Sequence, residues 1–369
     1  MNAMRPTSDC VDVRMGNRMH NRPADRAKGC THDRADASVG NRADGVVMVP
    51  GCPLAVHRWG DPQARVAVLL HGFMQSGSSW EPMVKRLVGA GWQVWAPDFA
   101  GHGESIAVPA SAYPFVAHVD AVQTIARKAA RSGAKPVVWG YSMGGRVAAA
   151  FACAHPDAAA AVVAESAGLG PRSESERQGR ACKNAALAAQ LRGAAGRLRG
   201  VSTQAHGTVE QESRIVPEAA LDAEPGSARA QPDDRFVAFV DAWEALPLFA
   251  SQRSLPADVR AAVRQERLDN QPEALALSLE RAGQQCMPNL RPALGRLRVP
   301  ALFMAGSLDV RYSGEVRALA AELADPPGAS SAQRAHFAIV EQAGHNIHLE
   351  QPDAALEEVM TFLQREGIA

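Results

Sequence analysis

Residues 140–144 read Gly-Tyr-Ser-Met-Gly, a G-x-S-x-G pattern that can carry chemistry. A serine between two close glycines can sit on a tight turn between a strand and a helix, with its hydroxyl lifted above the sheet. The apolar run PVVWG precedes the pattern and the alanine-rich run GRVAAAFACA follows it, as such a turn requires. We therefore predict that Ser142 is a functional serine rather than an ordinary helix-capping one.

A serine hydroxyl needs a base to become reactive, and two histidines near the end of the chain are candidates. His345 and His348 stand in the segment AGHNIHLEQP, shortly after an apolar run. His345 is nearer to the end of that run, so we favour it as the base over its rival. Either histidine could instead lie on the surface.

The base needs an acid that fixes its tautomer and stabilises the imidazolium. Asp309 in ALFMAGSLDVRY follows another apolar run by a short loop, although a solvated loop aspartate would look the same. The order Ser142, Asp309, His345 is the serine–acid–histidine order of the α/β-hydrolase fold. The three residues come from separate loops, and their joint order favours a catalytic triad.

A further candidate is an oxyanion hole, which needs two backbone N–H groups facing one point. His71-Gly72-Phe73 in LLHGFMQSGSSW follows an apolar run, where this fold places the second of these N–H groups. We predict that the N–H groups of Phe73 and Met143 form the hole. His102 in APDFAGHGES lies in the next such turn, and we interpret it as structural.

The elements that must position these residues alternate between strand and helix patterns. Short apolar runs that we predict to be buried strands cover 66–70, 92–97, 136–140, 160–165, 301–306 and 336–341. Helical patterns lie between several of them, at 80–89, 119–132 and 144–154. The fold class is therefore α/β, with a mostly parallel central sheet flanked by helices.

Two further patterns frame this alternation. A hairpin turning at Pro50-Gly51 precedes it. A closing helix over 352–366 follows it, with a buried face that we predict to consist of Leu356, Val359, Met360 and Leu363.

The alternation of predicted strands and helices stops between Glu165 and Val299, where the chain becomes rich in Ala, Arg and Glu. We interpret this stretch as a helical cap inserted into the sheet domain. Residues 1–45 contain almost nothing apolar, so we predict that they are disordered. The domain organisation is then a disordered extension over 1–45, a first core segment over 46–167, a helical cap over 168–295 with a mobile polar insert near 204–234, and a second core segment over 296–369.

Composition and charge bear on which classes of partner and which compartment we expect for the protein. Lys plus Arg and Asp plus Glu number 39 each, so the net charge of zero gives no reason to expect a nucleic acid or an anionic membrane as partner. The six cysteines are scattered, as free thiols in a reducing compartment would be. No run approaches the length of a membrane span, and the first 30 residues lack the apolar stretch of a secretory signal. We expect a cytoplasmic protein without a membrane span.

Residues 46–369 resemble the α/β-hydrolase superfamily, and within it the 2-succinyl-6-hydroxy-2,4-cyclohexadiene-1-carboxylate synthases of menaquinone biosynthesis. The strings that carry the resemblance are LLHGFMQSGSSW, GYSMGGR, ESAGL, FVDAWEALPLFAS, QERLDNQPEALALSLERAGQ and AGHNIHLEQP. The first and last are partly generic to the superfamily. GYSMGGR together with AWEALPLFAS and R-x-x-N-x-P-E-x-L-A-x-S-L is far more specific.

The resemblance implies a lyase that uses no cofactor and no metal. It would eliminate pyruvate from 2-succinyl-5-enolpyruvyl-6-hydroxy-3-cyclohexene-1-carboxylate, a small polycarboxylate. Ser142, activated by His345 and Asp309, would remove a proton and form no acyl-enzyme.

The resemblance also implies a set of substrate-binding residues: Tyr141, Arg146, Arg180, Trp243 and Arg267. Arginine suits the task because its planar guanidinium binds carboxylates through two parallel hydrogen bonds. Each arginine could instead lie on a solvated helix face, and Trp243 could simply pack within the cap.

The chain departs from the family pattern at several places, which bears on the substrate but not on the fold. Met287 stands where we expect a glutamine, and Arg311-Tyr312 replaces a Lys-Phe pair. The extension and the polar insert have no counterpart. One alternative is a serine carboxylesterase or C–C bond hydrolase with Ser142 as nucleophile, and another is a non-catalytic ligand-binding protein on the same fold.

Overall fold

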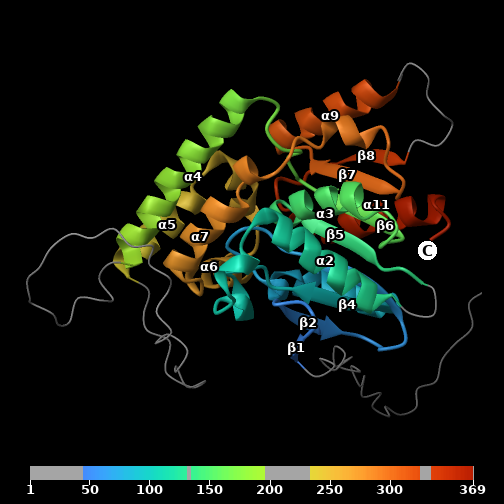
Figure 1. Cartoon of the computed structure of the whole chain (residues 1–369), viewed down its shortest axis with the longest axis horizontal. Coiled ribbons are helices and arrows are strands. Elements are labelled where there is room, and N and C mark those ends of the chain that lie inside the picture. Colours follow the sequence, from blue (N-terminus) through green and yellow to red (C-terminus); the bar gives the residue numbers. More distant parts are fainter. Residues whose placement is uncertain (1–44, 131–133, 196–232, 325–333, 369) are drawn as a thin grey trace, which may run out of the picture. The chain divides into compact units, whose positions relative to one another are not determined.

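The computed structural model describes residues 45–130, 134–195, 233–324 and 334–368 (Figure 1). Apart from Gly45 and residues 233–234, the extension 1–45 and the insert near 204–234 lie outside the described residues. Within these ranges, no helix combines the length and the apolar character that crossing a membrane requires.

The described residues form an eight-stranded sheet in the order β1-β2-β4-β3-β5-β6-β7-β8. β1 pairs with β2 and β2 with β4 in antiparallel fashion, while the other neighbours are parallel. The predicted α/β class and the predicted hairpin are confirmed. The strands are β1 Val46–Met48, β2 Ala55–Trp59, β3 Arg65–Leu70, β4 Trp92–Pro97, β5 Val137–Tyr141, β6 Ala161–Glu165, β7 Ala301–Gly306 and β8 Ala335–Val340.

Helices cover both faces of the sheet (Figure 1). In β3, Val66 and Val68 pack in one apolar cluster with residues of α2 and α3, and Ala67 and Leu69 pack in another with residues of α1 and α11. A strand with two covered faces needs a continuous apolar run, which is why the short runs in the sequence predicted strands well. The helices of the core are α1 Glu81–Gly89, α2 Phe115–Ala129, α3 Met143–Ala154, α9 Val310–Ala324, α10 Ile347–Glu350 and α11 Pro352–Arg365, with 3-10 turns η1 Gly77–Trp80, η2 Gly103–Ser105 and η3 Ala110–Ala112.

The closing helix α11 buries a face slightly rotated from the predicted one. Its fully buried residues are Ala355, Val359, Phe362 and Leu363. Leu356 and Met360 are only partly buried and pack at the edge of the same cluster. The prediction was wrong for these two because it gave the small Ala355 no weight, although Ala355 is fully buried.

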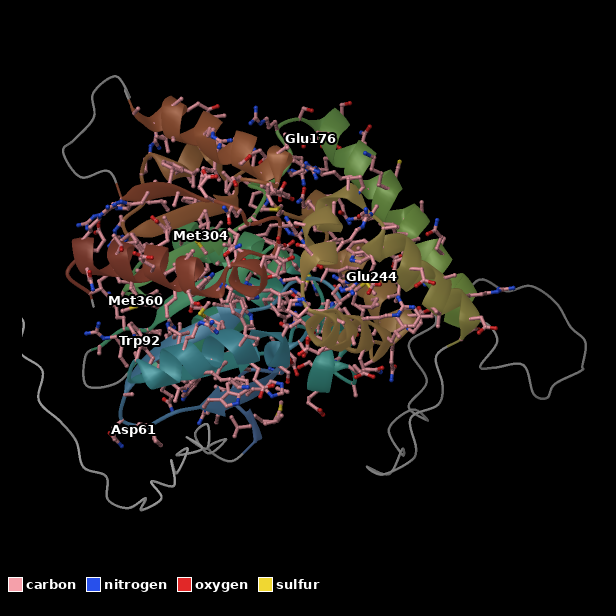
Figure 2. All side chains as sticks on the ribbon, turned by 180° about the vertical axis from the view of Figure 1, so that it is seen from behind. Asp61, Trp92, Glu176, Glu244, Met304 and Met360 are labelled. Atoms are coloured by element: carbon pink, nitrogen blue, oxygen red, sulfur yellow. The ribbon has the colours of Figure 1, made fainter. Side chains whose placement is uncertain are left out.

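Between β6 and β7 the described residues form only helical elements, and we call the described residues within 174–294 the cap. Figure 2 labels Glu176 and Glu244 within it. The cap has an apolar cluster of its own, which Met74 of the core joins. Its elements are α4 Glu174–Ala195, α5 Asp234–Glu244, η5 Pro247–Ser254, α6 Ala257–Leu268, α7 Pro272–Ala282, η6 Gln284–Cys286 and α8 Arg291–Leu294.

Candidate active site

Ser142 lies on a strained turn between β5 and α3. Its backbone has φ 50° and ψ −102°, a region that residues other than glycine rarely adopt. The N–H of Ser142 donates to the carbonyl of Glu165 at 2.8 Å, which holds the turn against β6. A Cβ atom at Gly140 would clash with the carbonyl of Gly144, and one at Gly144 would clash with that of Leu70. The two glycines of the motif are therefore required by close backbone packing.

The three residues predicted as a triad meet in space. The Ser142 Oγ lies 3.0 Å from His345 Nε2, and His345 Nδ1 lies 2.7 Å from an oxygen of Asp309. With Nδ1–H donated to the carboxylate, Nε2 is left as the acceptor for the serine proton. This is the arrangement in which a histidine can act as a base toward a hydroxyl group.

Asp309 is itself held in place. It is 6% exposed, and its second oxygen accepts a hydrogen bond from the backbone N–H of Tyr312 at 3.1 Å. The Tyr312 ring packs against the His345 ring with 5.1 Å between centroids. Position and tautomer of the imidazole are thus fixed from two sides.

The two predicted oxyanion-hole residues line the same pocket as Ser142. Neither the N–H of Phe73 nor that of Met143 donates to another described residue, so both are free to bind a ligand atom. The Nδ1 of His71 donates to the carbonyl of Gly72 at 2.7 Å, which belongs to the same peptide unit as the Phe73 N–H. Burial lowers the pKa of His71 to about 4, so a neutral ring makes this bond. His102 is fully buried 5.2 Å from the His71 ring and forms no hydrogen bond with Ser142.

A pocket of about 270 Å³ joins these groups at the boundary of core and cap. All five predicted substrate-binding residues line it together with Ser142 and His345: Tyr141, Arg146, Arg180, Trp243 and Arg267. Further polar lining residues that the sequence analysis did not single out as substrate-binding are Gln75, Lys183, Asn184, Ser278, Gln284, Arg311 and Tyr312. Gln75, Ser278 and Gln284 stand in the strings that carry the family resemblance, whereas Lys183 and Asn184 do not.

The three predicted arginines differ in their partners. Arg146 has no carboxylate partner among the described residues, and its guanidinium reaches only the carbonyl of Ala282 at 3.5 Å. Burial lowers the pKa of Arg146 to about 10, which leaves it charged at neutral pH. Arg180 is paired with Glu176 at 2.6 Å, and Arg267 with Glu244 at 2.9 Å. Of the three predicted arginines, the half-buried Arg146 is therefore the one most ready to take an anionic ligand.

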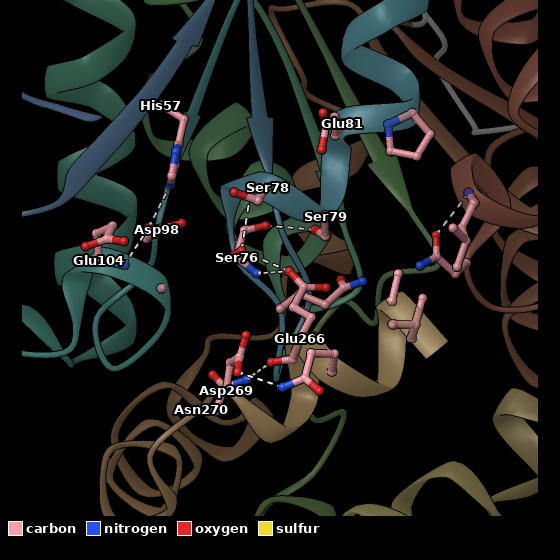
Figure 3. A pocket seen from close by; sticks show the side chains of 18 of the residues that line it. His57, Ser76, Ser78, Ser79, Glu81, Asp98, Glu104, Glu266, Asp269 and Asn270 are labelled. Atoms are coloured by element: carbon pink, nitrogen blue, oxygen red, sulfur yellow. Dashed lines mark hydrogen bonds and ion pairs between the residues drawn. The ribbon is translucent and has the colours of Figure 1, made fainter. Parts of the chain in front are cut away.

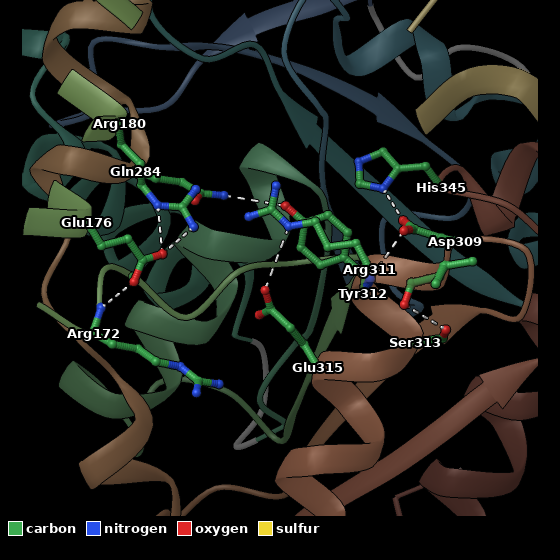
Figure 4. Close-up of polar contacts among 12 residues, drawn as sticks. Arg172, Glu176, Arg180, Gln284, Asp309, Arg311, Tyr312, Ser313, Glu315 and His345 are labelled. Atoms are coloured by element: carbon green, nitrogen blue, oxygen red, sulfur yellow. Dashed lines mark hydrogen bonds and ion pairs between the residues drawn. The ribbon is translucent and has the colours of Figure 1, made fainter. Parts of the chain in front are cut away.

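The departures from the family pattern have clear places in the structure. Figure 4 shows Arg311 directed toward Glu315 and Tyr312 beside Gln284, whose amide donates to the tyrosine hydroxyl at 3.4 Å. Tyr312 thus adds a hydroxyl group to the wall of the pocket. Met287 is fully buried in the apolar core, where a glutamine would lack solvent.

A larger cavity of about 580 Å³ lies elsewhere along the boundary between core and cap, and none of the three triad residues lines it. Figure 3 shows Glu266 of α6 directed at Ser76 of the core, whose N–H and hydroxyl both donate to it at 2.9 Å. Burial raises the pKa of Glu266 to about 7. No group of three or more His, Cys, Asp and Glu side chains in the described ranges has the arrangement of a metal site.

A sequence profile of the alpha/beta hydrolase fold matches residues 66–352. The chain belongs to this family. Among solved structures of alpha/beta hydrolase fold proteins, MenH from S. aureus is 24% identical with a TM-score of 0.64, covering 85% of this chain and 98% of that one. An esterase from Thermogutta terrifontis is 20% identical with a TM-score of 0.58, covering 85% and 94%. At these identities the likeness shows the shared fold.

Two curated relatives of this alpha/beta hydrolase are named after the same synthase activity. A putative 2-succinyl-6-hydroxy-2,4-cyclohexadiene-1-carboxylate synthase of Bacillus subtilis (strain 168) is 28% identical over 319 residues, 86% of this chain and 97% of that one. The synthase of Salmonella schwarzengrund (strain CVM19633) is 27% identical over 312 residues, 84% and 98% of the two chains. The resemblance seen in the sequence is confirmed, at moderate identity.

Proposed function

We propose that this alpha/beta hydrolase acts as a 2-succinyl-6-hydroxy-2,4-cyclohexadiene-1-carboxylate synthase. It would be a lyase that eliminates pyruvate from 2-succinyl-5-enolpyruvyl-6-hydroxy-3-cyclohexene-1-carboxylate. The observation that carries the proposal is the meeting of a serine–histidine–aspartate arrangement with four arginines at one small pocket. The names of the curated relatives support the same reaction.

The proposed chemistry begins with a proton on ring carbon 2, beside the succinyl ketone. His345 Nε2 accepts the hydroxyl proton of Ser142 while the serine oxygen takes the proton from carbon 2. The electron pair of that C–H bond forms a double bond between carbons 2 and 3, and the ring double bond moves to carbons 4 and 5. The bond from carbon 5 to oxygen breaks, and the departing enolpyruvate takes up a proton to become pyruvate.

Charge would develop on the succinyl carbonyl oxygen as the proton leaves. The free N–H groups of Phe73 and Met143 are the candidates that stabilise this oxygen. Asp309 stabilises the imidazolium of His345. The carboxylates of the substrate would bind Arg146, Arg180 and Arg267, because a guanidinium forms strong charge-assisted hydrogen bonds.

The test is pyruvate release from the substrate, generated in the assay by the enzyme that makes it. Native protein is compared with Ser142→Ala and with the uncatalysed background. We expect native protein to accelerate release and the variant to lose at least about 10³-fold in turnover, since it lacks the base. Native release at the background rate would refute the proposal.

Two other outcomes would identify the alternative functions. Cleavage of simple esters with a burst of acyl-enzyme, in the absence of pyruvate release, would indicate a hydrolase with Ser142 as nucleophile. Binding of the polycarboxylate without any turnover would indicate a ligand-binding protein.

A further inference from the structure

A second histidine–carboxylate pair lies directly behind the candidate triad. Glu165, at the end of β6, is fully buried, and His348 in α10 is 2% exposed. The carboxylate of Glu165 accepts hydrogen bonds from Trp139 Nε1–H at 2.9 Å, from the backbone N–H of His348 at 3.1 Å and from His348 Nδ1–H at 2.9 Å. Three N–H donors around one buried carboxyl group suit the ionised form, which only accepts hydrogen bonds.

Glu165 connects the two segments that carry Ser142 and His345. Its backbone carbonyl accepts the N–H of Ser142 at 2.8 Å and so holds the strained turn. Its side chain binds His348, which follows His345 by three residues. One residue therefore fixes the serine through its backbone and the histidine segment through its carboxylate.

Aromatic packing links the same groups. The His348 ring is stacked on Trp80 with 3.8 Å between centroids. The Tyr141 ring meets the rings of both His345 and His348 edge-on, at 5.4 and 5.1 Å. A shift of His348 would therefore displace a ring that also contacts the proposed base.

His348 itself cannot serve as a base toward a ligand in the pocket. It does not line the pocket, and its Nε2 is buried without a hydrogen-bond partner among the described residues. In a neutral ring whose Nδ1–H is directed at Glu165, Nε2 carries only an unsatisfied lone pair. This costs less free energy than the buried, unpaired Nε2–H that an imidazolium would have. The pair thus holds atoms in place and transfers no proton to a ligand.

We propose that Glu165 and His348 are a positioning pair that sets the distance between Ser142 and the Nε2 of His345. The proposal rests on the proposed joint action of Ser142 and His345, and not on the identity of the substrate. A displacement of reacting groups by about 1 Å can slow a reaction by about 10²-fold, so loss of the pair should be visible in rates.

The test uses four variants and a readout that needs no substrate, the rate at which a fluorophosphonate labels Ser142. His348→Leu removes the bond to Glu165, and His348→Asn restores a donor at the position of Nδ1. Trp139→Phe is the matched control, because it removes another hydrogen bond of Glu165, keeps an aromatic ring against Trp80 and leaves the hydrogen bond between Glu165 and His348 in place. His345→Ala reports on the triad itself. The melting temperature is measured for each.

We expect His348→Leu to label roughly 10- to 100-fold more slowly than native protein, His348→Asn to recover most of that loss, and Trp139→Phe to label at the native rate despite a lowered melting temperature. The turnover number should follow the same order, with KM little changed. Labelling of His348→Leu at the native rate, with His345→Ala slow, would overturn the positioning pair alone. Labelling of His345→Ala at the native rate would overturn the proposed triad instead.

Discussion

In the α/β core, the side chains of the candidate triad follow β5, β7 and β8, and the hydrogen-bond ladders of the sheet fix where these strands end. In the cap, the arginines that line the same pocket stand on helices and are held by side-chain carboxylates. Arg180 is bound by Glu176 and Arg267 by Glu244. A backbone ladder has no competing partner within the sheet, whereas a carboxylate of the protein can give way to a carboxylate of a ligand.

The difference suggests a division of tasks. The core presents a reaction geometry that exists before any ligand binds, since the distances of 3.0 and 2.7 Å are those of formed hydrogen bonds. The cap presents cations that are paired with carboxylates of the protein, and under the proposed function a polycarboxylate would replace these partners. Arg146 stands on α3 of the core and has no carboxylate partner among the described residues, so it should bind the first carboxylate without any replacement.

The largest effect is expected where the core geometry is broken. Asp309→Asn replaces an acceptor with a group that can donate to His345, and this favours the tautomer whose Nε2 carries the proton. That nitrogen can no longer take the proton of Ser142. We expect turnover to fall by about 10⁴-fold with little change in KM, measured by pyruvate release.

Asp120→Asn is the control for this variant, because Asp120 also faces a histidine, His155 at 3.9 Å, but lies on the outside of α2. It should leave turnover unchanged. An Asp309→Asn variant with more than a tenth of native turnover would show that the histidine works without its acid. The contrast between a fixed core and an adaptable cap would then lose its main support.

The sequence predicted the core better than the cap for a physical reason. A parallel strand with two covered faces is a short apolar run, and such runs are visible without knowledge of their neighbours. The runs at 92–97 and 301–306 coincide with β4 and β7 in full. The cap helices bury only part of their residues, so the sequence predicted their helical character but not where each helix begins and ends.

Within the candidate site too, the sequence predicted some residues and missed others. Ser142, Asp309 and His345 were found from chain order, because each residue follows a strand and the fold fixes where strand ends meet. The role of Glu165 was missed, since a buried carboxylate inside an apolar run looks like the end of a strand and its partner His348 is 183 residues away. The sequence indicates Tyr312 only as a departure from the family pattern, because its contact with Gln284 depends on how the cap lies over the core.

A second test concerns Glu266, which joins cap and core through Ser76. Burial raises its pKa from the ordinary 4.5 to about 7, so between these values the folded chain binds more protons than the unfolded one. The contribution of this group to stability is therefore full below pH 4.5 and is lost as the pH rises through 7. Glu266→Gln keeps an acceptor for Ser76 and removes the charge. Relative to native protein, its free energy of unfolding should rise by up to about 3 kcal/mol between pH 4.5 and pH 8.

Urea unfolding of both proteins at several pH values measures this difference, and the other titrating groups cancel in it. Glu81→Gln serves as control, since Glu81 lines the same cavity but is exposed. A difference between Glu266→Gln and native protein that stays constant with pH would mean that Glu266 is solvated at the junction. The cap would then be attached to the core less tightly than the contact with Ser76 indicates.

The smallest expected effect is a change in KM, and it is tested by replacing one arginine of the core and one arginine of the cap. Arg146→Ala removes a cation without a carboxylate partner in the described ranges, and hydrogen bonds to charged groups contribute about 1.5 to 3 kcal/mol. We expect KM for the polycarboxylate to rise about 10- to 100-fold. Arg180→Ala should raise KM by less than about 10-fold, because Glu176 already competes for this guanidinium. Both values come from the pyruvate assay at constant ionic strength.

Two further variants sharpen this last comparison. Glu176→Gln removes the ion pair of Arg180 and should lower KM. A lower KM would show directly that Glu176 competes with the ligand for Arg180. Arg298→Ala is the control, because Arg298 pairs with Asp157 on the surface with 69% of its side chain exposed and should leave KM unchanged. A larger KM effect for Arg180→Ala than for Arg146→Ala, together with no effect of Glu176→Gln, would mean that the pair in the cap remains intact when the ligand binds. The cap would then be as fixed as the core, and the adaptable region of the pocket would have to be sought at Arg267 and Glu244.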